Sequence, residues 1–174
     1  MQAGNHQPRF IMHTDDYLLD MLGDLGYATP DQIACARKDM EGSETRGAVD
    51  LLLERNIIMP IDVAIAKAGH FGANFIRLQS ETIALSRDVI GMVPKRIALK
   101  YRVCPIKHNY GTLTVAVLDP SDLATIDSLT HLLNVEIEIV ITMPENIIWA
   151  LRRCYGFSQE EAETAVNNPI AVAA

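Results

Sequence analysis

The first half of the chain contains an internal repeat, which limits the possible folds more than any other feature of the sequence. Residues 19–22 (Leu-Asp-Met-Leu) align with residues 49–52 (Val-Asp-Leu-Leu), and the match continues without a gap through a proline and an alanine pair in each copy. A sequence that recurs at a fixed spacing, here 30 residues, indicates one structural unit used twice. Leucines at helical spacing predict two helices and a tight turn in each copy, and hence a bundle of about four helices.

The turns of the two copies carry residues that end one helix and start the next. Gly26 stands where the first helix should end, and Asn56 fills the same place in the second copy. Glycine and asparagine adopt the left-handed backbone of such a helix end more readily than other residues do. Residues 29–32 (Thr-Pro-Asp-Gln) then predict a capping box at the start of the next helix. Met59 replaces Thr29 in the second copy, so we expect a less sharply defined helix start there.

In the second half of the chain, the spacing of apolar residues changes from that of helices to the two-residue period of strands. The predicted elements are a helix over residues 87–101 broken at Pro94, a hairpin over 103–118, a helix over 123–133, a strand over 135–141 and a helix over 146–155. The fold class is therefore α+β. We predict a flexible tail over residues 1–14, a helical tandem-repeat subdomain over 15–74, an α/β subdomain with about three strands over 75–156, and a tail or linker over 157–174.

Charge and cysteine content exclude several classes of protein. Acidic side chains outnumber basic ones by 22 to 15, a formal charge of −7, which argues against binding of a nucleic acid polymer. The polar N-terminus lacks the apolar stretch of a secretory signal, so we expect a cytoplasmic protein. The three cysteines, Cys35, Cys104 and Cys154, are widely spaced, which predicts buried free thiols in a reducing compartment.

No group of residues in the sequence predicts a catalytic centre, a cofactor or a metal site. The phosphate-binding string G-x-x-x-x-G-K-[ST] does not occur, and the histidines and cysteines lack the paired spacing of zinc ligands. Two carboxylate pairs, Asp119 with Asp122 and Glu136 with Glu138, have the residue types needed for acid and base catalysis. We interpret the first pair as a helix cap and the second as the polar face of a strand.

One segment reverses the acidic character of the chain. Between residues 95 and 107 there are five cations and no acidic side chain: Lys95, Arg96, Lys100, Arg102 and Lys107. Basic segments of this kind are usually a helix face exposed to water. The alternative, because the charge reverses that of the chain, is a docking patch for an acidic partner or a phosphate group.

Three motifs in the second half occur in the order found in one known family. Residues 92–106 contain a Val-Pro pair followed by Ala98, Tyr101, Val103 and Pro105; residues 113–123 read LTVAVLDPSDL; and residues 147–156 close with an Ala-Leu pair and Tyr-Gly. This order resembles the N-terminal domain of type II secretion and type IV pilus assembly ATPases. The helical tandem before it is similar to the N-terminal repeats of that family, so the resemblance covers about residues 15–156.

The resemblance implies a domain that has no ATPase chemistry of its own. It implies docking onto the cytoplasmic domain of an inner-membrane assembly protein, and hence a cytoplasmic location at the inner membrane through that partner. The ATPase motor domain of the family would follow near residue 157, so we expect either a fragment of a longer protein or a free-standing relative without the motor.

Some members of the family bind cyclic di-GMP through the tandem repeats, and their motif is only partly matched here. The matching residues are Leu22, Gly26 and Leu52, whereas Tyr17 and Met40 occupy the places of the motif arginine and glutamine. Lost polar contacts to a phosphate or a guanine base each cost about 1–3 kcal/mol. The resemblance therefore leaves a cyclic di-GMP receptor as the alternative function, with a ligand site that we expect to have decayed.

Overall fold

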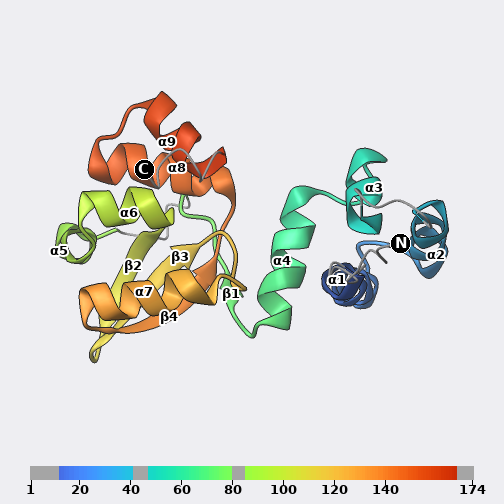
Figure 1. The fold of residues 1–174 in the computed structure, drawn as a ribbon, viewed down its shortest axis with the longest axis horizontal. Helices are drawn as coiled ribbons and strands as arrows, with labels where there is room; N and C mark the ends of the chain where they lie inside the picture. Colours follow the sequence, from blue (N-terminus) through green and yellow to red (C-terminus); the bar gives the residue numbers. More distant parts are fainter. Residues whose placement is uncertain (1–11, 41–46, 80–84, 168–174) are drawn as a thin grey trace, which may run out of the picture. The chain divides into compact units, whose positions relative to one another are not determined.

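The computed structural model describes residues 12–40, 47–79 and 85–167, which form two compact units (Figure 1). The first unit runs to Ala66 and the second begins at Lys67, so the division falls inside one helix. The boundary predicted after residue 74 stays a prediction. No helix in the described part of the chain is long and apolar enough to cross a bilayer.

The first unit is built from the four helices that the repeat predicts. They are α1 (Met12–Asp24), α2 (Pro30–Asp39), α3 (Ala48–Glu54) and α4 (Pro60–His70), the last of which continues into the second unit. Leucines from α1 and α3 and alanines from α2 and α4 form one buried cluster. Burial of these apolar side chains supplies most of the stability of helices this short, which are marginal on their own.

The two copies of the repeat have the same local structure. Residues 21–30 and 51–60 have the same sequence of buried, half-buried and exposed positions. At the end of α1 the carbonyl oxygen of Leu22 accepts the N–H of Tyr27 at 2.9 Å, and at the end of α3 that of Leu52 accepts the N–H of Ile57 at 3.0 Å. Gly26 and Asn56 have φ angles of +76° and +54°. The tandem repeat and its two left-handed helix ends are therefore confirmed.

The start of α2 is the capping box that the sequence predicts. The Thr29 N–H donates to the side-chain oxygen of Gln32 at 2.8 Å, and the Gln32 N–H donates to the Thr29 hydroxyl at 3.3 Å. In the second copy, the Met59 N–H donates to the carboxylate of Asp62 at 2.7 Å. Met59 itself offers no acceptor, so α4 retains one of the two reciprocal bonds that fix the start of α2.

Replacement of Thr29 by alanine is expected to lower the free energy of unfolding by about 1 kcal/mol, because the first turn of α2 loses a hydrogen-bond acceptor. Urea denaturation followed by circular dichroism measures this loss. A Thr29→Ser variant keeps the hydroxyl and is the control; a loss as large in the serine variant would show that the methyl group, not the cap, matters.

The second unit combines a four-stranded sheet with helices. Its elements are β1 (Asn74–Phe75), α5 (Arg87–Met92), α6 (Lys95–Tyr101), β2 (Cys104–Asn109), β3 (Thr112–Val117), α7 (Leu123–Leu133), β4 (Glu136–Ile141), α8 (Pro144–Tyr155) and α9 (Gln159–Asn167). The strand order is β1-β4-β3-β2, with β2 antiparallel to β3 and the other pairs parallel. The α+β fold class is confirmed. The strand beyond the three expected is β1, whose two residues are too few to show a period.

The two faces of the sheet have different side chains, as the alternation in β4 predicts. Leu113, Val115 and Val117 of β3 share one face with the isoleucines of β4. On the other face, the hydroxyl of Thr114 donates to Glu138 at 2.7 Å, and that of Thr112 donates to Glu136 at 3.3 Å. Helix α7 contacts β4, and α6, α8 and α9 pack together (Figure 1). The glutamate pair is thus the polar face of a strand.

The segment after residue 156 differs from the tail that the sequence analysis expects. Helix α9 begins where the Ser158 N–H donates to the carboxylate of Glu161 at 2.8 Å, and the Glu161 N–H donates to the Ser158 hydroxyl at 3.2 Å. Ala162, Ala165 and Val166 are buried against the unit, and α9 contacts α8 and α6. These three residues stand at helical spacing, but small apolar side chains among acidic residues predict a buried helix only weakly. A linker role of this segment stays a prediction.

Candidate functional site

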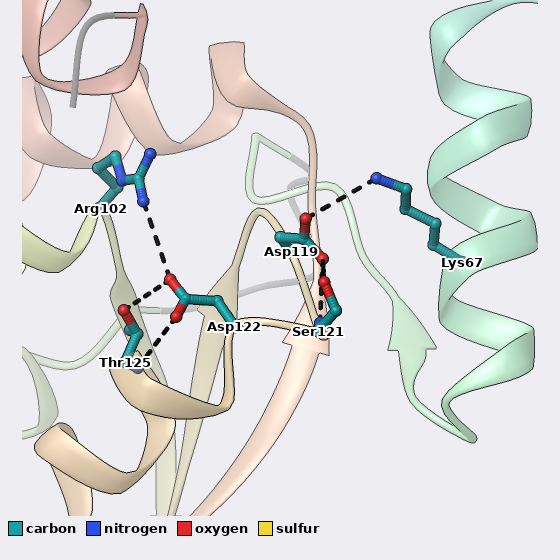
Figure 2. Close-up of polar contacts among 6 residues, drawn as sticks. All are labelled: Lys67, Arg102, Asp119, Ser121, Asp122 and Thr125. Atoms are coloured by element: carbon teal, nitrogen blue, oxygen red, sulfur yellow. Dashed lines mark hydrogen bonds and ion pairs between the residues drawn. The ribbon is translucent and has the colours of Figure 1, made fainter. Parts of the chain in front are cut away.

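The loop between β3 and α7 contains a group of hydrogen-bonded polar side chains (Figure 2). The Asp119 carboxylate accepts the N–H and the hydroxyl of Ser121 at 3.0 and 2.6 Å. The Asp122 carboxylate caps α7 by accepting the N–H and the hydroxyl of Thr125 at 3.1 and 2.7 Å. Because short local bonds engage both carboxylates, the pair fixes the start of α7, in agreement with its interpretation as a helix cap.

Two cations approach this loop from other elements. Lys67, in the last part of α4, lies 3.9 Å from Asp119, and Arg102 lies 4.0 Å from Asp122 (Figure 2). Arg102 has a left-handed backbone with φ of +54°, which ends α6. Its Nε atom is buried and has no hydrogen-bond partner. A cavity of about 320 Å³ borders Arg102 and both carboxylates.

The electrostatics of Asp119 reflect opposing influences. Burial is the largest single influence and raises the pKa of its carboxyl group. Hydrogen bonds from Ser121 and the charges of Lys67 and Arg102 act the other way and hold the pKa below its ordinary value. Asp119 is therefore ionised at neutral pH, and it is suited to electrostatic fixing of the loop rather than to proton transfer.

An Asp119→Asn variant keeps an oxygen that accepts from Ser121 but loses the charge facing Lys67. Since the side chain is about half exposed, water screens that interaction, and we expect a loss of roughly 0.5 kcal/mol at pH 7. A carboxyl group with a lowered folded-state pKa stabilises above its unfolded pKa of about 4, and the benefit disappears as pH falls through the folded value. Urea unfolding should therefore show a smaller difference in the free energy of unfolding between variant and parent at pH 3 than at pH 7. Asp127→Asn, a substitution on α7, is the control.

The structure divides the five cations of the basic segment among different surroundings. Arg96 and Lys100 are exposed and one helical turn apart on α6, so they share a face. The Lys95 ammonium lies 4.2 Å from the ring centre of Phe157. Arg102 turns toward Asp122, and Lys107 is exposed on β2 opposite Thr114. The basic segment is therefore an exposed pair on one face of α6, with Lys95 at the start of the same helix beside Phe157 and with Arg102 and Lys107 beyond its end.

The three residues that match the cyclic di-GMP motif lie in the apolar core and at a helix end of the first unit. Leu22 and Leu52 are fully buried at equivalent positions, and Gly26 forms the left-handed turn after α1. Beside them, α1 and α2 border a groove of about 880 Å³. Two cations border this groove, Arg37 and Lys38, and Arg37 lies 3.3 Å from Asp16 and 3.2 Å from Asp20. An anionic ligand in this groove would compete with two carboxylates for that guanidinium group.

The ion pair between Lys67 and Asp119 has no signal in the sequence. Lys67 sits in the repeat, 52 residues before Asp119, and only the folded chain brings the two together. No local motif signals such a contact. In the described part of the chain, no group of three or more histidine, cysteine or carboxylate side chains is arranged to hold a metal ion.

Comparison with known proteins identifies the second unit. A sequence profile of the MshEN domain matches residues 71–161, more than half of the chain. The chain belongs to the MshEN domain family. The profile covers β1 through the start of α9, including the loop of Asp119 and the basic helix α6. The resemblance to the N-terminal domain of secretion and pilus assembly ATPases is thereby confirmed.

Individual relatives agree with the family assignment. The type IV pilus assembly ATPase PilB of Myxococcus xanthus is 33% identical over 81 residues, which are 47% of this chain but only 14% of that protein. The MshEN chain also has the fold of MshE, solved with cdg, with a TM-score of 0.64 and 23% identity over 79% of this chain and 98% of the other. The N-terminal domain of XpsE gives a TM-score of 0.54 at 16% identity, over 79% and 93%.

Proposed function

We propose that this MshEN chain is the docking and regulatory part of a type II secretion or type IV pilus assembly ATPase. In this proposal it binds the cytoplasmic domain of an inner-membrane platform protein and carries no ATPase chemistry itself. The observation that carries the proposal is the family match over residues 71–161 together with the identity to a pilus assembly ATPase. The protein is then cytoplasmic and is held at the inner membrane through its partner.

The exposed cations of α6 are the proposed contact with the platform. Arg96 and Lys100 have no ion pair among the described residues, in a chain whose formal charge is −7. A positive patch on an acidic protein guides association with an acidic partner, because opposite charges attract there while the net charges of the two proteins repel.

A competition experiment in the cells from which this chain comes tests the proposed function. Overproduction of the chain should occupy the platform and reduce pilus assembly or secretion, while an Arg96→Glu/Lys100→Glu variant made at the same level should have much less effect. Full assembly or secretion in cells that contain abundant folded chain would contradict the proposal.

A cyclic di-GMP receptor is the second candidate, and the fold shared with the MshE chain solved with cdg (cyclic di-GMP) favours it. The match covers 79% of this chain, more than the second unit alone, so it includes at least part of the helical repeats. Tyr17 and Met40 at the places of polar motif residues, and the ion pairs of Arg37, oppose it. Calorimetric titration with cyclic di-GMP distinguishes the two: we expect no saturable heat, and binding at micromolar or lower concentration would establish the receptor.

A further inference from the structure

The two sides of the sheet in the second unit differ in how well they are protected against pairing with another chain. Strand β2 forms one edge of the sheet, and α5 contacts it. β2 contains Pro105, which has no N–H to donate, and its pairing with β3 shifts register between Pro105 and Lys107. A proline and an irregular register are two of the features that keep an edge strand from pairing with a further strand. The β2 edge is therefore protected.

The opposite side of the sheet is covered over only part of its length. There β1 pairs with Val140 and Ile141 of β4 and with no earlier residue of that strand (Figure 1). Residues 136–139 of β4 pair with β3 on one side in a continuous register, and in the described part of the chain no strand lies on their other side. We call residues 136–139 the open edge.

The backbone of the open edge directs hydrogen-bonding groups outward at every second residue. In a parallel ladder, the N–H and C=O of one residue face one neighbouring strand, and those of the next residue face the other. Ile141 faces the β1 side, because its carbonyl oxygen accepts the N–H of Ile76 at 2.8 Å. By this alternation Ile139 and Ile137 face the same side, beyond the start of β1. Their N–H groups therefore point to a place where a further strand can pair.

The side chains of the open edge give its two faces different chemistry. Glu136 and Glu138 are exposed on one face, and each accepts a threonine hydroxyl from β3 through its Oε2 atom. Within the described residues, Oε1 of both carboxylates has no hydrogen-bond or ion-pair partner. On the other face Ile137 and Ile139 are half-buried, whereas Leu113, opposite Ile137 on β3, is fully buried. The open edge is thus acidic on one face and apolar on the other.

We propose that the open edge binds an extended segment of a partner protein, which adds a strand to the sheet and in which lysine or arginine alternates with an apolar residue. The main chain of the segment pairs with the outward groups of Ile137 and Ile139. Its basic side chains lie beside the two glutamates and its apolar side chains beside the two isoleucines, because neighbouring residues of paired strands share a face. In such strand addition the main-chain hydrogen bonds supply affinity and the alternating side chains supply specificity.

The charge of the open edge argues against a second copy of this chain as the occupant. If two copies paired antiparallel through their open edges, Glu136 and Glu138 of both copies would lie side by side on one face. Like charges directly opposite each other destabilise a pair of strands, whereas opposite charges stabilise it. A basic segment is therefore the occupant that fits. This contact is separate from the platform contact proposed for α6 and does not depend on it.

Methylation of a peptide backbone distinguishes strand addition from simple attraction of charges. The probe is a capped, fluorescent peptide of alternating lysine and valine, and two control peptides carry N-methyl groups on the valines or on the lysines. The intact chain should bind the probe saturably, measured by fluorescence anisotropy, and should bind at least one methylated peptide about tenfold or more weakly, because its pairing N–H groups are gone. Equal binding of all three peptides, or no saturable binding of the probe, would overturn the proposal.

Amide hydrogen exchange measured by NMR locates the bound peptide on the chain. With the probe present, the N–H groups of Ile137 and Ile139 should exchange about tenfold or more slowly than in the free chain. Unchanged exchange at both residues while the probe is bound would place the peptide elsewhere and contradict the proposal. Slow exchange of both N–H groups in the chain alone, together with a dimer in sedimentation, would show that a second copy is the occupant.

Reversal of the two glutamates tests the charge complementarity. Glu136→Lys/Glu138→Lys should weaken binding of the probe by about tenfold or more. Glu160→Lys/Glu163→Lys makes the same change in net charge at exposed positions of α9 and should retain most of the binding. Equal weakening by both variants would show that total charge alone attracts the peptide. Circular dichroism establishes that each variant is folded, and the methylated peptides test the parent chain without any substitution.

Discussion

Replacement of Leu22 by alanine should lower the free energy of unfolding of the first unit by about 2–5 kcal/mol. Leu22 is 0% exposed and belongs to the apolar cluster formed by all four helices, so the deletion leaves a cavity that short helices cannot easily close. Urea denaturation followed at a helical circular dichroism signal measures the loss. Leu52→Ala should lose a similar amount, because Leu52 holds the equivalent place in the second copy.

The control for these leucines lies in the same turn. Leu25 is 45% exposed, and Leu25→Ala should change the free energy of unfolding by less than about 1 kcal/mol. A loss of under 1 kcal/mol for both Leu22→Ala and Leu52→Ala would show that these residues are not the core of the repeat. In that case the match of Leu22 and Leu52 to the cyclic di-GMP motif would indicate a role in ligand binding and not in the core.

Reversal of the exposed pair on α6 should weaken binding to the platform domain by roughly tenfold or more at low ionic strength. Arg96→Glu/Lys100→Glu replaces two cations that face water by two anions that repel an acidic partner. The effect should shrink as salt is raised, since exposed charges are screened within about 10 Å at 0.1 M salt. Biolayer interferometry over a range of salt concentrations measures both features.

A variant with the same change in net charge provides the control. Lys38→Glu/Arg77→Glu alters two exposed cations outside the basic segment, one on α2 and one after β1. Equal weakening by both variants would show that only total charge matters. If only the control variant bound the platform domain more weakly, the contact would lie on a surface other than α6.

Much of the fold could be predicted because its signals are local. Helix ends at Gly26 and Asn56 follow from the backbone freedom of those residues, and the cap of α2 from the reciprocal bonds of Thr29 and Gln32. The strand face of Glu136 and Glu138 follows from simple alternation. Each of these depends on residues within four positions of one another.

The features that sequence reasoning missed depend on contacts across the fold. Arg102 is one of five cations in the sequence, but its left-handed backbone turns it toward Asp122 and away from its neighbours on α6. Lys67 meets Asp119 only after the sheet and its helices have packed. The sequence predicts three buried thiols, whereas Cys35 is exposed, Cys104 is buried and Cys154 is half-buried.

The most direct measurement for the proposed function is an equilibrium titration of this chain with the purified cytoplasmic domain of the platform protein from the same cells. We predict saturable binding of one chain per platform domain, retained by Lys38→Glu/Arg77→Glu and weakened by Arg96→Glu/Lys100→Glu. The absence of measurable binding by the intact, folded chain would contradict it.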